Sequence, residues 1–81
     1  MNEQDLRAGI MAELTSVAPE VDPATLAGAK LLREQVDLDS MDWLNFLIGL
    51  HKRFEVDIPE SDYARLRTLD DLIAYLGARV R

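Results

Sequence analysis

The chain has 81 residues, of which 48% are hydrophobic, and a formal net charge of −6 that comes from 15 acidic and nine basic residues. It contains no cysteine, which excludes disulfide bonds and any thiolate nucleophile or metal ligand. The negative charge disfavours nucleic acid, whose binding requires cations that displace phosphate counterions, and no apolar run approaches the roughly 18 residues of a membrane span.

The N-terminal half is predicted to contain one long helix followed by a long loop. Residues 2–16 carry apolar side chains at helical spacing, and Asn2 with Asp5 three positions later is typical of an N-terminal cap. Residues 17–38 contain two prolines, which disfavour a continuous helix, although residues 24–34 are compatible with a short one. We expect this loop to be held against the core by its own apolar side chains, namely Val21, Leu26, Leu31, Leu32 and Val36.

The C-terminal half predicts two more long helices joined by a shorter one. The second helix is expected to span residues 40–54. Residues 55–67 then form a turn and a short helix, with Pro59 suited to the first helical position. The last helix begins at Thr68, which forms an approximate capping box with Asp71.

These elements predict an all-α fold. It is a small four-helix bundle, with three main helices plus one short helix and a long first loop, and residues 1–81 form a single domain. The N-terminus lacks the basic start and the apolar block of a signal peptide, so we expect a cytoplasmic protein. We also expect a monomer.

Apolar side chains occupy most of the circumference of the helix at residues 40–54. At about 100° per residue, they cover a wider arc than the apolar stripe of a surface helix. We therefore expect this helix to be the most buried one, with Trp43 in the core. The apolar edge near Met41, Leu44 and Ile48 is expected to remain uncovered, as a partner surface or the lip of a cavity. The alternative is that these three residues are simply core.

Ser40 stands where this helix begins, and the sequence leaves two roles open for it. Ser40 or Asp39 can cap the helix by accepting a backbone hydrogen bond. Ser40 can instead be a site of covalent attachment. Catalysis by the Ser40 hydroxyl is disfavoured, because the one histidine, His51, is about 16 Å away at ~1.5 Å per residue along a helix. We expect His51 to have a structural role, partly exposed or hydrogen-bonded.

A metal site is not expected either. The aspartates in this stretch suggest a calcium loop that starts at Asp37. Such a loop requires glycine at its sixth position and glutamate at its twelfth. Those positions hold Asp42 and Ile48.

The stretch DSMDWLNFLIGLHKRFEVDIP at residues 39–59 and the stretch LRTLDDLIAYL at residues 66–76 resemble the acyl carrier protein family. The resemblance extends from about residue 6 to residue 76. It implies a four-helix bundle with a long first loop, in agreement with the elements predicted above. The chain has Asp37 where family members usually have a glycine shortly before the Asp-Ser pair.

The resemblance also implies a cofactor. A phosphopantetheinyl transferase would attach 4′-phosphopantetheine from coenzyme A to Ser40, and the thiol of that arm would carry acyl groups as thioesters. The transferase would recognise Asp39 and would make a hydrophobic contact with Met41, next to the attachment site. On this reading the chain is not an enzyme. It is a carrier substrate of acyl-activating, acyl-transfer or condensing enzymes.

The residues on the second helix indicate which partners such a carrier has. Family members from fatty-acid synthesis typically carry glutamates there, whereas this chain has Asn45 and the basic run at residues 51–53. We expect a specialised carrier of a lipid, polyketide or secondary-metabolite pathway. Acidic residues still outnumber basic ones between residues 34 and 62, which favours encounter with basic enzyme surfaces. The residues expected to recognise partners are Asp42, Leu44, Asn45 and Ile48.

Two alternatives stay open. The first is a carrier of aminoacyl or peptidyl groups in nonribosomal synthesis, although peptidyl carriers more often have Gly-Gly-x-Ser where this chain has an aspartate before Ser40. The second is an unmodified helical interaction module, in which the serine merely caps the helix.

Overall fold

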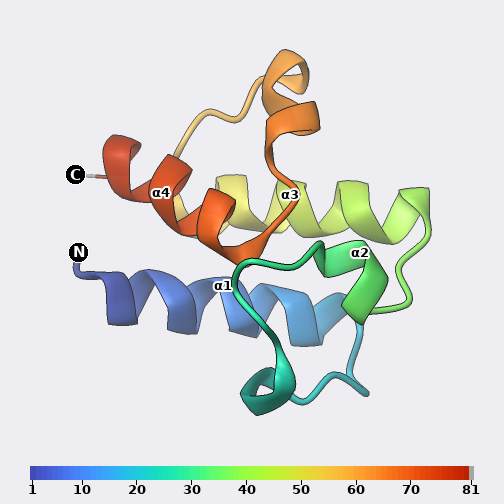
Figure 1. The fold of residues 1–81 in the computed structure, drawn as a ribbon. Coiled ribbons are helices and arrows are strands. Elements are labelled where there is room, and N and C mark those ends of the chain that lie inside the picture. The colour runs from blue at the N-terminus through green and yellow to red at the C-terminus, as the bar shows by residue number, and fades with distance from the viewer. Residues whose placement is uncertain (81) are drawn as a thin grey trace.

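The computed structural model describes residues 1–80. Their secondary structure is helical apart from one isolated bridge between Leu31 and Thr68. Three long helices dominate, which confirms the all-α prediction (Figure 1). The elements in chain order are α1 (Glu3–Val17), η1 (Pro23–Thr25), α2 (Leu32–Gln35), α3 (Ser40–Phe54), η2 (Glu60–Arg65) and α4 (Leu69–Arg79).

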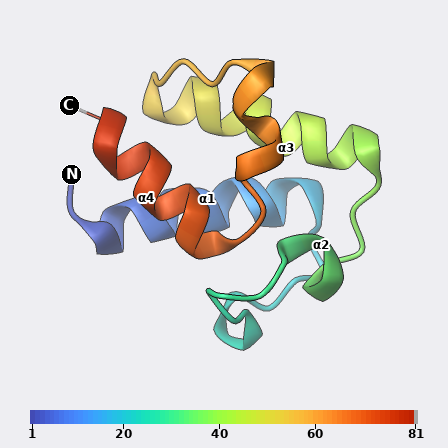
Figure 2. The same ribbon diagram turned by 45° about the horizontal axis from the view of Figure 1, so that its top comes forward.

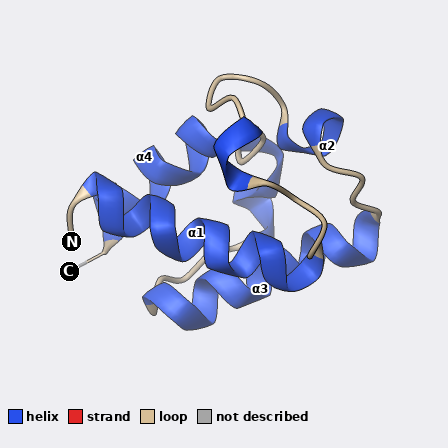
Figure 3. Cartoon of the chain, turned by 90° about the horizontal axis from the view of Figure 1, so that it is seen from below, coloured by secondary structure: helices blue, strands red, loops and turns tan. Residues whose placement is uncertain are grey.

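The other two long helices, α3 and α4, pack against α1. Helices α1 and α3 lie side by side and run in opposite directions, and α4 packs across α1 (Figures 1 and 2). The start of α1 and the end of α4 lie at the same end of the bundle, and the long first loop with α2 lies toward the other (Figure 3). The start of α3, where Ser40 lies, is therefore remote from the chain termini.

The core is apolar and is built from every part of the bundle. Ile10 and Leu14 of α1, Phe46 of α3, and Leu72 and Leu76 of α4 are completely shielded from solvent. Side chains at such spacing along a helix point to the same face. The apolar faces of α3 and α4 therefore both pack against α1.

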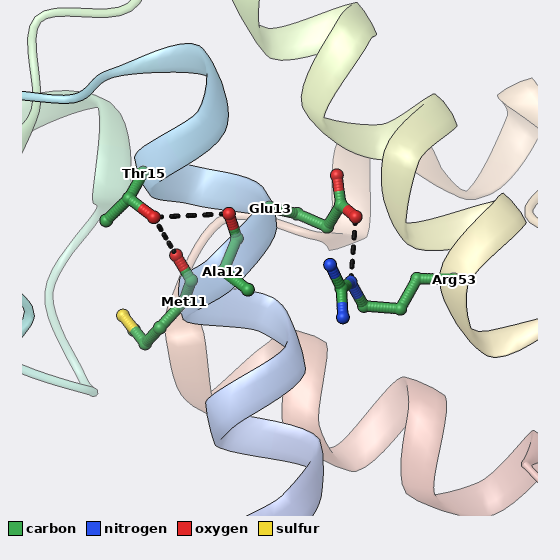
Figure 4. Close-up of polar contacts among 5 residues, drawn as sticks. All are labelled: Met11, Ala12, Glu13, Thr15 and Arg53. Atoms are coloured by element: carbon green, nitrogen blue, oxygen red, sulfur yellow. Dashed lines mark hydrogen bonds and ion pairs between the residues drawn. The ribbon is translucent and has the colours of Figure 1, made fainter.

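The close approach of α1 and α3 depends on a glycine and an ion pair. A Cβ atom placed on Gly9 would lie 2.5 Å from the ring of Phe54, so a larger residue there would force this ring to move. Farther along, the Nε atom of Arg53 donates a hydrogen bond to Glu13 at 2.7 Å (Figure 4). Arg53 is about half exposed, so this ion pair contributes at most about 1 kcal/mol.

The termini of the long helices follow the local rules of capping. The side chain of Asn2 accepts a hydrogen bond from the backbone N–H of Asp5 at 2.8 Å, as predicted. Thr68 and Asp71 form the predicted capping box, in which each side chain accepts a hydrogen bond from the backbone of the other.

The long first loop is held by polar bonds as well as by apolar contacts. The side-chain amide of Gln35 accepts a hydrogen bond from Ala27 N–H at 2.7 Å and donates to the carbonyl groups of Ala27 and Lys30. The backbone of Gly28 accepts a hydrogen bond from Asp70 at the start of α4. Gln35 thus replaces the backbone partners that this irregular segment lacks.

The apolar residues of the loop agree with the prediction in all but one case. Leu32 and Val36 are buried, and Val21 and Leu26 are partly buried against the core. Leu31 was expected to join them, but 37% of it is exposed. The cause is its place in the bridge to Thr68, because neighbouring residues in extended backbone point to opposite sides. Leu32 faces the core, and Leu31 faces outward.

The expectation that residues 40–54 form the most buried helix is wrong. Four of the 15 residues of α3 are buried, against five of the 11 residues of α4. The wide apolar arc of α3 exceeds what α1 and the shorter segments cover. No helix within residues 1–80 combines the length and the apolar composition that crossing a membrane requires.

Candidate functional site

The first turn of α3 assigns separate roles to two adjacent residues. Asp39 is the N-cap, in an extended conformation, and its carboxylate accepts a hydrogen bond from the backbone N–H of Asp42 at 2.8 Å. Ser40 is the first helical residue and is exposed. The structure shows no hydrogen bond to the Ser40 hydroxyl from any residue in the range 1–80. Of the two caps that the sequence allowed, Asp39 is the one used.

Apolar side chains continue from this turn along the surface of α3. Met41 is 64% exposed, Leu44 37% and Ile48 38%. Their spacing places them within an arc of about 60° at ~100° per residue, and we call these three residues the α3 strip. Their exposure confirms the prediction of an uncovered apolar edge. The alternative, in which all three are core, is wrong.

Polar residues flank the α3 strip. Asn45 is exposed beside it, and Asp42 is half-buried on the same side of the helix. Contiguous exposed apolar side chains with a polar border are typical of a protein-binding surface. The residues predicted to recognise partners therefore lie on one continuous face that begins next to Ser40.

A pocket of about 380 Å³ lies on another side of the same turn, between α3, η2 and the start of α2. Trp43 forms one wall and is only half-buried, which corrects the expectation that it lies in the core. Its indole lies at the edge of the core, 5.4 Å from the ring of Phe46 between centroids. The remaining lining residues are Leu31, Arg33, Tyr63, Ala64, Leu66 and Arg67.

Sequence reasoning missed the two arginines of this pocket. Arg33 and Arg67 are far apart in the chain and belong to no motif. Both line the pocket because Leu32 N–H donates a hydrogen bond to the carbonyl group of Arg67 at 3.0 Å, beside the bridge between Leu31 and Thr68. Such a long-range contact leaves no signal in a single sequence.

His51 has the structural role that was expected. Its Nδ1 lies 2.7 Å from the carbonyl oxygen of Val56. The bond spans Glu55, whose φ of 54° places it in the left-handed region at the end of α3. His51 thus stabilises the turn that ends the helix, eleven positions away from Ser40.

Tyr75 fastens η2 to α4. Its hydroxyl donates a hydrogen bond to Asp62 at 2.6 Å, and Asp62 also lies 3.9 Å from Arg65. Burial, followed by this hydrogen bond, raises the pKa of Tyr75 above its ordinary value of 10.0. The guanidinium of Arg79 lies 3.6 Å from the centre of the Tyr75 ring. This arrangement positions the η2 side of the pocket.

Comparison with known proteins gives a consistent result. The family described as "Phosphopantetheine attachment site" matches residues 8–76. The chain is 30% identical over 70 residues to an acyl carrier protein of Rhodococcus erythropolis, a match that covers 83% of this chain and 77% of the relative. It is 28% identical over 75 residues to the meromycolate extension acyl carrier protein of Mycolicibacterium aurum, covering 93% of this chain and 76% of that protein.

The fold gives the same answer. A solution structure assigned as an acyl carrier protein of Anaplasma phagocytophilum superposes with a TM-score of 0.84 at 26% identity, covering 96% of this chain and 91% of the other. The chain spans 65% of the length of the meromycolate extension acyl carrier proteins of Mycobacterium bovis and Mycobacterium tuberculosis. The family match, the curated relatives and the fold agree, and this chain therefore belongs to the acyl carrier proteins, the family whose cofactor is phosphopantetheine.

Proposed function

We propose that Ser40 is the residue that carries the 4′-phosphopantetheine arm, and that the arm holds acyl groups as thioesters. The observation that supports this assignment is that Asp39, and not Ser40, caps the start of α3. Because Asp39 supplies the capping oxygen, Ser40 is exposed. Modification of its hydroxyl would therefore break no hydrogen bond within residues 1–80.

Attachment is a phosphoryl transfer from coenzyme A. The Ser40 oxygen attacks the phosphorus atom that bears pantetheine, forming a new P–O bond. The P–O bond to 3′,5′-ADP breaks, and 3′,5′-ADP leaves with the electron pair. The hydroxyl proton passes to a base of the transferase, because the one histidine of this chain, His51, is engaged about 16 Å farther along the helix at ~1.5 Å per residue.

The surroundings of Ser40 favour access more than they favour binding of the arm. A phosphodiester at an exposed helix N-terminus gains about 0.3–1 kcal/mol from the helix dipole. The like charges of Asp39 and Asp42 oppose that gain. The arm is therefore free to move between partner enzymes and the surface of its own carrier. Asp39 and Met41 are the neighbours that the transferase would contact first.

The α3 strip, with Asp42 and Asn45, is proposed as the surface that recognises partner enzymes. The partners are a phosphopantetheinyl transferase and enzymes that activate, transfer or condense acyl groups. Acidic residues around α3 steer encounter with basic surfaces, and the exposed side chains of the strip supply apolar contact. On this proposal the chain is a carrier substrate and performs no catalysis of its own.

We further propose that residues 1–81 work as one carrier domain, in the cytoplasm and as a monomer, within a specialised pathway. Two features support the specialised role. Asn45 and the basic run at residues 51–53 interrupt the acidic side of α3. In addition, several relatives are named for meromycolate extension. Efficient elongation of acyl groups on this carrier by a general fatty-acid synthase set would contradict this part of the proposal.

The attachment itself is tested by intact mass. The protein is incubated with coenzyme A and a transferase of broad specificity, and a gain of one phosphopantetheine is expected. The gain must vanish in Ser40→Ala and persist in Ser61→Ala, a matched control because Ser61 is also exposed and lies between acidic residues. Absence of the gain with several active transferases would contradict the proposal and favour the unmodified interaction module.

A further inference from the structure

We propose that the pocket lined by Trp43 accepts an acyl group with a carboxylate at its far end, and that Arg33 and Arg67 bind this carboxylate. The inference rests on the proposed function, since the acyl group would be delivered by the arm on Ser40. It names the class of cargo, which is the half-acid thioester of a short dicarboxylic acid.

The pocket lies within reach of the attachment site. Trp43 is one helical turn after Ser40, a rise of about 4.5 Å at ~1.5 Å per residue. The volume of about 380 Å³ lies within the range of small-ligand pockets. Leu31, Leu66 and Ala64 provide apolar walls that suit the methylene groups of an acyl chain.

The charges at the pocket set it apart from a purely apolar cavity. Two arginines line this pocket, and one of them, Arg67, also lines a neighbouring pocket together with Arg65 and Arg79. Three other arginines are engaged: Arg53 pairs with Glu13, Arg65 lies near Asp62, and Arg79 lies over the ring of Tyr75, whereas Arg7 on α1 forms no ion pair within residues 1–80. Within residues 1–80, neither Arg33 nor Arg67 forms an ion pair with a carboxylate.

The two arginines are held together by the backbone. The hydrogen bond from Leu32 N–H to the carbonyl oxygen of Arg67 joins α2 to the segment before α4. The backbone N–H of Arg67 is in turn bonded to Asp71 at 3.2 Å. Both arginines are exposed and extend from backbone segments that this bond joins, so that little backbone entropy is lost when an anion binds at the pocket.

A carboxylate is the group that fits this arrangement. Guanidinium groups match carboxylates with paired hydrogen bonds. A neutral acyl chain would end in a methyl group beside two hydrated cations and would desolvate them without compensation. The phosphodiester of the arm is a second anion, but it is common to every loaded form and does not distinguish one acyl group from another.

The test compares two acyl groups of equal length on the same arm. Adipoyl and hexanoyl forms are made from the corresponding coenzyme A thioesters with a transferase of broad specificity, and loading is verified by mass in the native protein and in Ser40→Ala. Hydroxylamine then attacks the thioester carbonyl group, forming the hydroxamate and releasing the thiol of the arm. Its rate on each carrier is divided by its rate on the free coenzyme A thioester.

We expect the adipoyl group to be protected more than the hexanoyl group by about fivefold, the size that two partly exposed ion pairs supply. The difference should shrink at high salt and should disappear in the double variant Arg33→Gln/Arg67→Gln. The double variant Arg7→Gln/Lys52→Gln, which removes the same two charges from exposed residues outside the pocket, should retain it. Circular dichroism confirms that each variant is folded.

The outcomes separate the two proposals. Equal protection of both acyl groups on a loaded Ser40 overturns the inference about cargo and leaves the carrier function intact. Equal loss of the difference in Arg7→Gln/Lys52→Gln also overturns it, because the effect would then come from net charge. Failure to load Ser40 contradicts the proposed function itself, and with it the inference.

Discussion

The carboxylate of Asp39 caps α3 by accepting a hydrogen bond from the backbone N–H of Asp42 at 2.8 Å. This bond leaves Ser40 exposed at the first helical position. The stability of the helix and the availability of the hydroxyl thus depend on different residues, and substitutions can separate them.

Asp39→Ala should lower the free energy of unfolding by about 1 kcal/mol, because the first turn of α3 loses its capping acceptor. Ser40→Ala should change it by less than about 0.5 kcal/mol, as expected for an exposed residue without a hydrogen bond. Chemical denaturation measures both. A larger loss in Ser40→Ala than in Asp39→Ala would contradict the assignment of the cap.

Asp39→Asn separates capping from recognition. Asparagine caps helices about as well as aspartate, so the stability of this variant should stay near that of the native protein. If the transferase reads the negative charge, its rate of modification should fall in Asp39→Asn while the fold is unchanged. A normal rate would show that Asp39 serves only as the cap.

Local rules predicted the parts of the fold that depend on neighbours in sequence. The cap at Asn2 and the capping box of Thr68 with Asp71 each lie within one helical turn, and the structure confirms both. The loop around Gln35 follows no such rule. The side chain of Gln35 bonds to Ala27, eight residues earlier, and only the folded chain reveals that contact.

Local sequence likewise predicted one part of the candidate site and missed another. The exposed edge of α3 follows from the helical period of its apolar residues, and Met41 fits that prediction. The half-burial of Trp43 does not follow from that period, and neither does the presence of Arg33 and Arg67 in one pocket. They depend on where η2 and α2 settle against α3, which periodicity along one helix does not specify.

Glu55→Gly should stabilise the protein by up to about 1 kcal/mol. Glu55 has a φ of 54° at the end of α3, a conformation that costs a residue with a Cβ atom and suits glycine. Thermal and chemical denaturation measure the gain. Glu55→Ala is the matched control: it removes the same charge and retains the Cβ atom, so stabilisation of equal size in both variants would point to charge and not to backbone strain.

Tyr75→Phe should lower the free energy of unfolding by about 0.5–1.5 kcal/mol at neutral pH, because the hydrogen bond to Asp62 is lost. Tyr63→Phe is the control. Its hydroxyl forms no hydrogen bond with any residue in the range 1–80, so it should change stability less. Equal losses in the two variants would show that the bond to Asp62 contributes nothing.

The contribution of Tyr75 should also depend on pH. Burial, and after it the hydrogen bond to Asp62, raises the pKa of Tyr75 in the folded protein above 10.0. Above about pH 10 the unfolded chain releases this proton while the folded protein still holds it, so stability falls as pH rises. The difference in stability between the native protein and Tyr75→Phe should therefore be constant below pH 9 and should shrink above pH 10. A difference that grew with pH would contradict the stated direction.

Trp43→Ala should extend the range of acyl chains that the carrier protects. The indole forms a wall of the pocket beside Ser40, and its removal leaves more room for methylene groups. Rates of thioester cleavage by hydroxylamine on a series of saturated acyl forms measure the effect. Trp43→Phe, which keeps an aromatic ring beside Phe46, should change the chain-length dependence less. An unchanged dependence in Trp43→Ala would show that the acyl chain does not enter this pocket.

Peptide mapping of the modified protein can locate the phosphopantetheine on a single serine. Trypsin places each of the three serines in a separate peptide, because cleavage sites separate residues 8–30, 34–52 and 54–65. After reaction with coenzyme A and a transferase, we expect the phosphopantetheine mass on the peptide of residues 34–52, with fragment ions that locate it on Ser40. The same mass on either of the other two peptides, or on none while a reference carrier is modified, would contradict it.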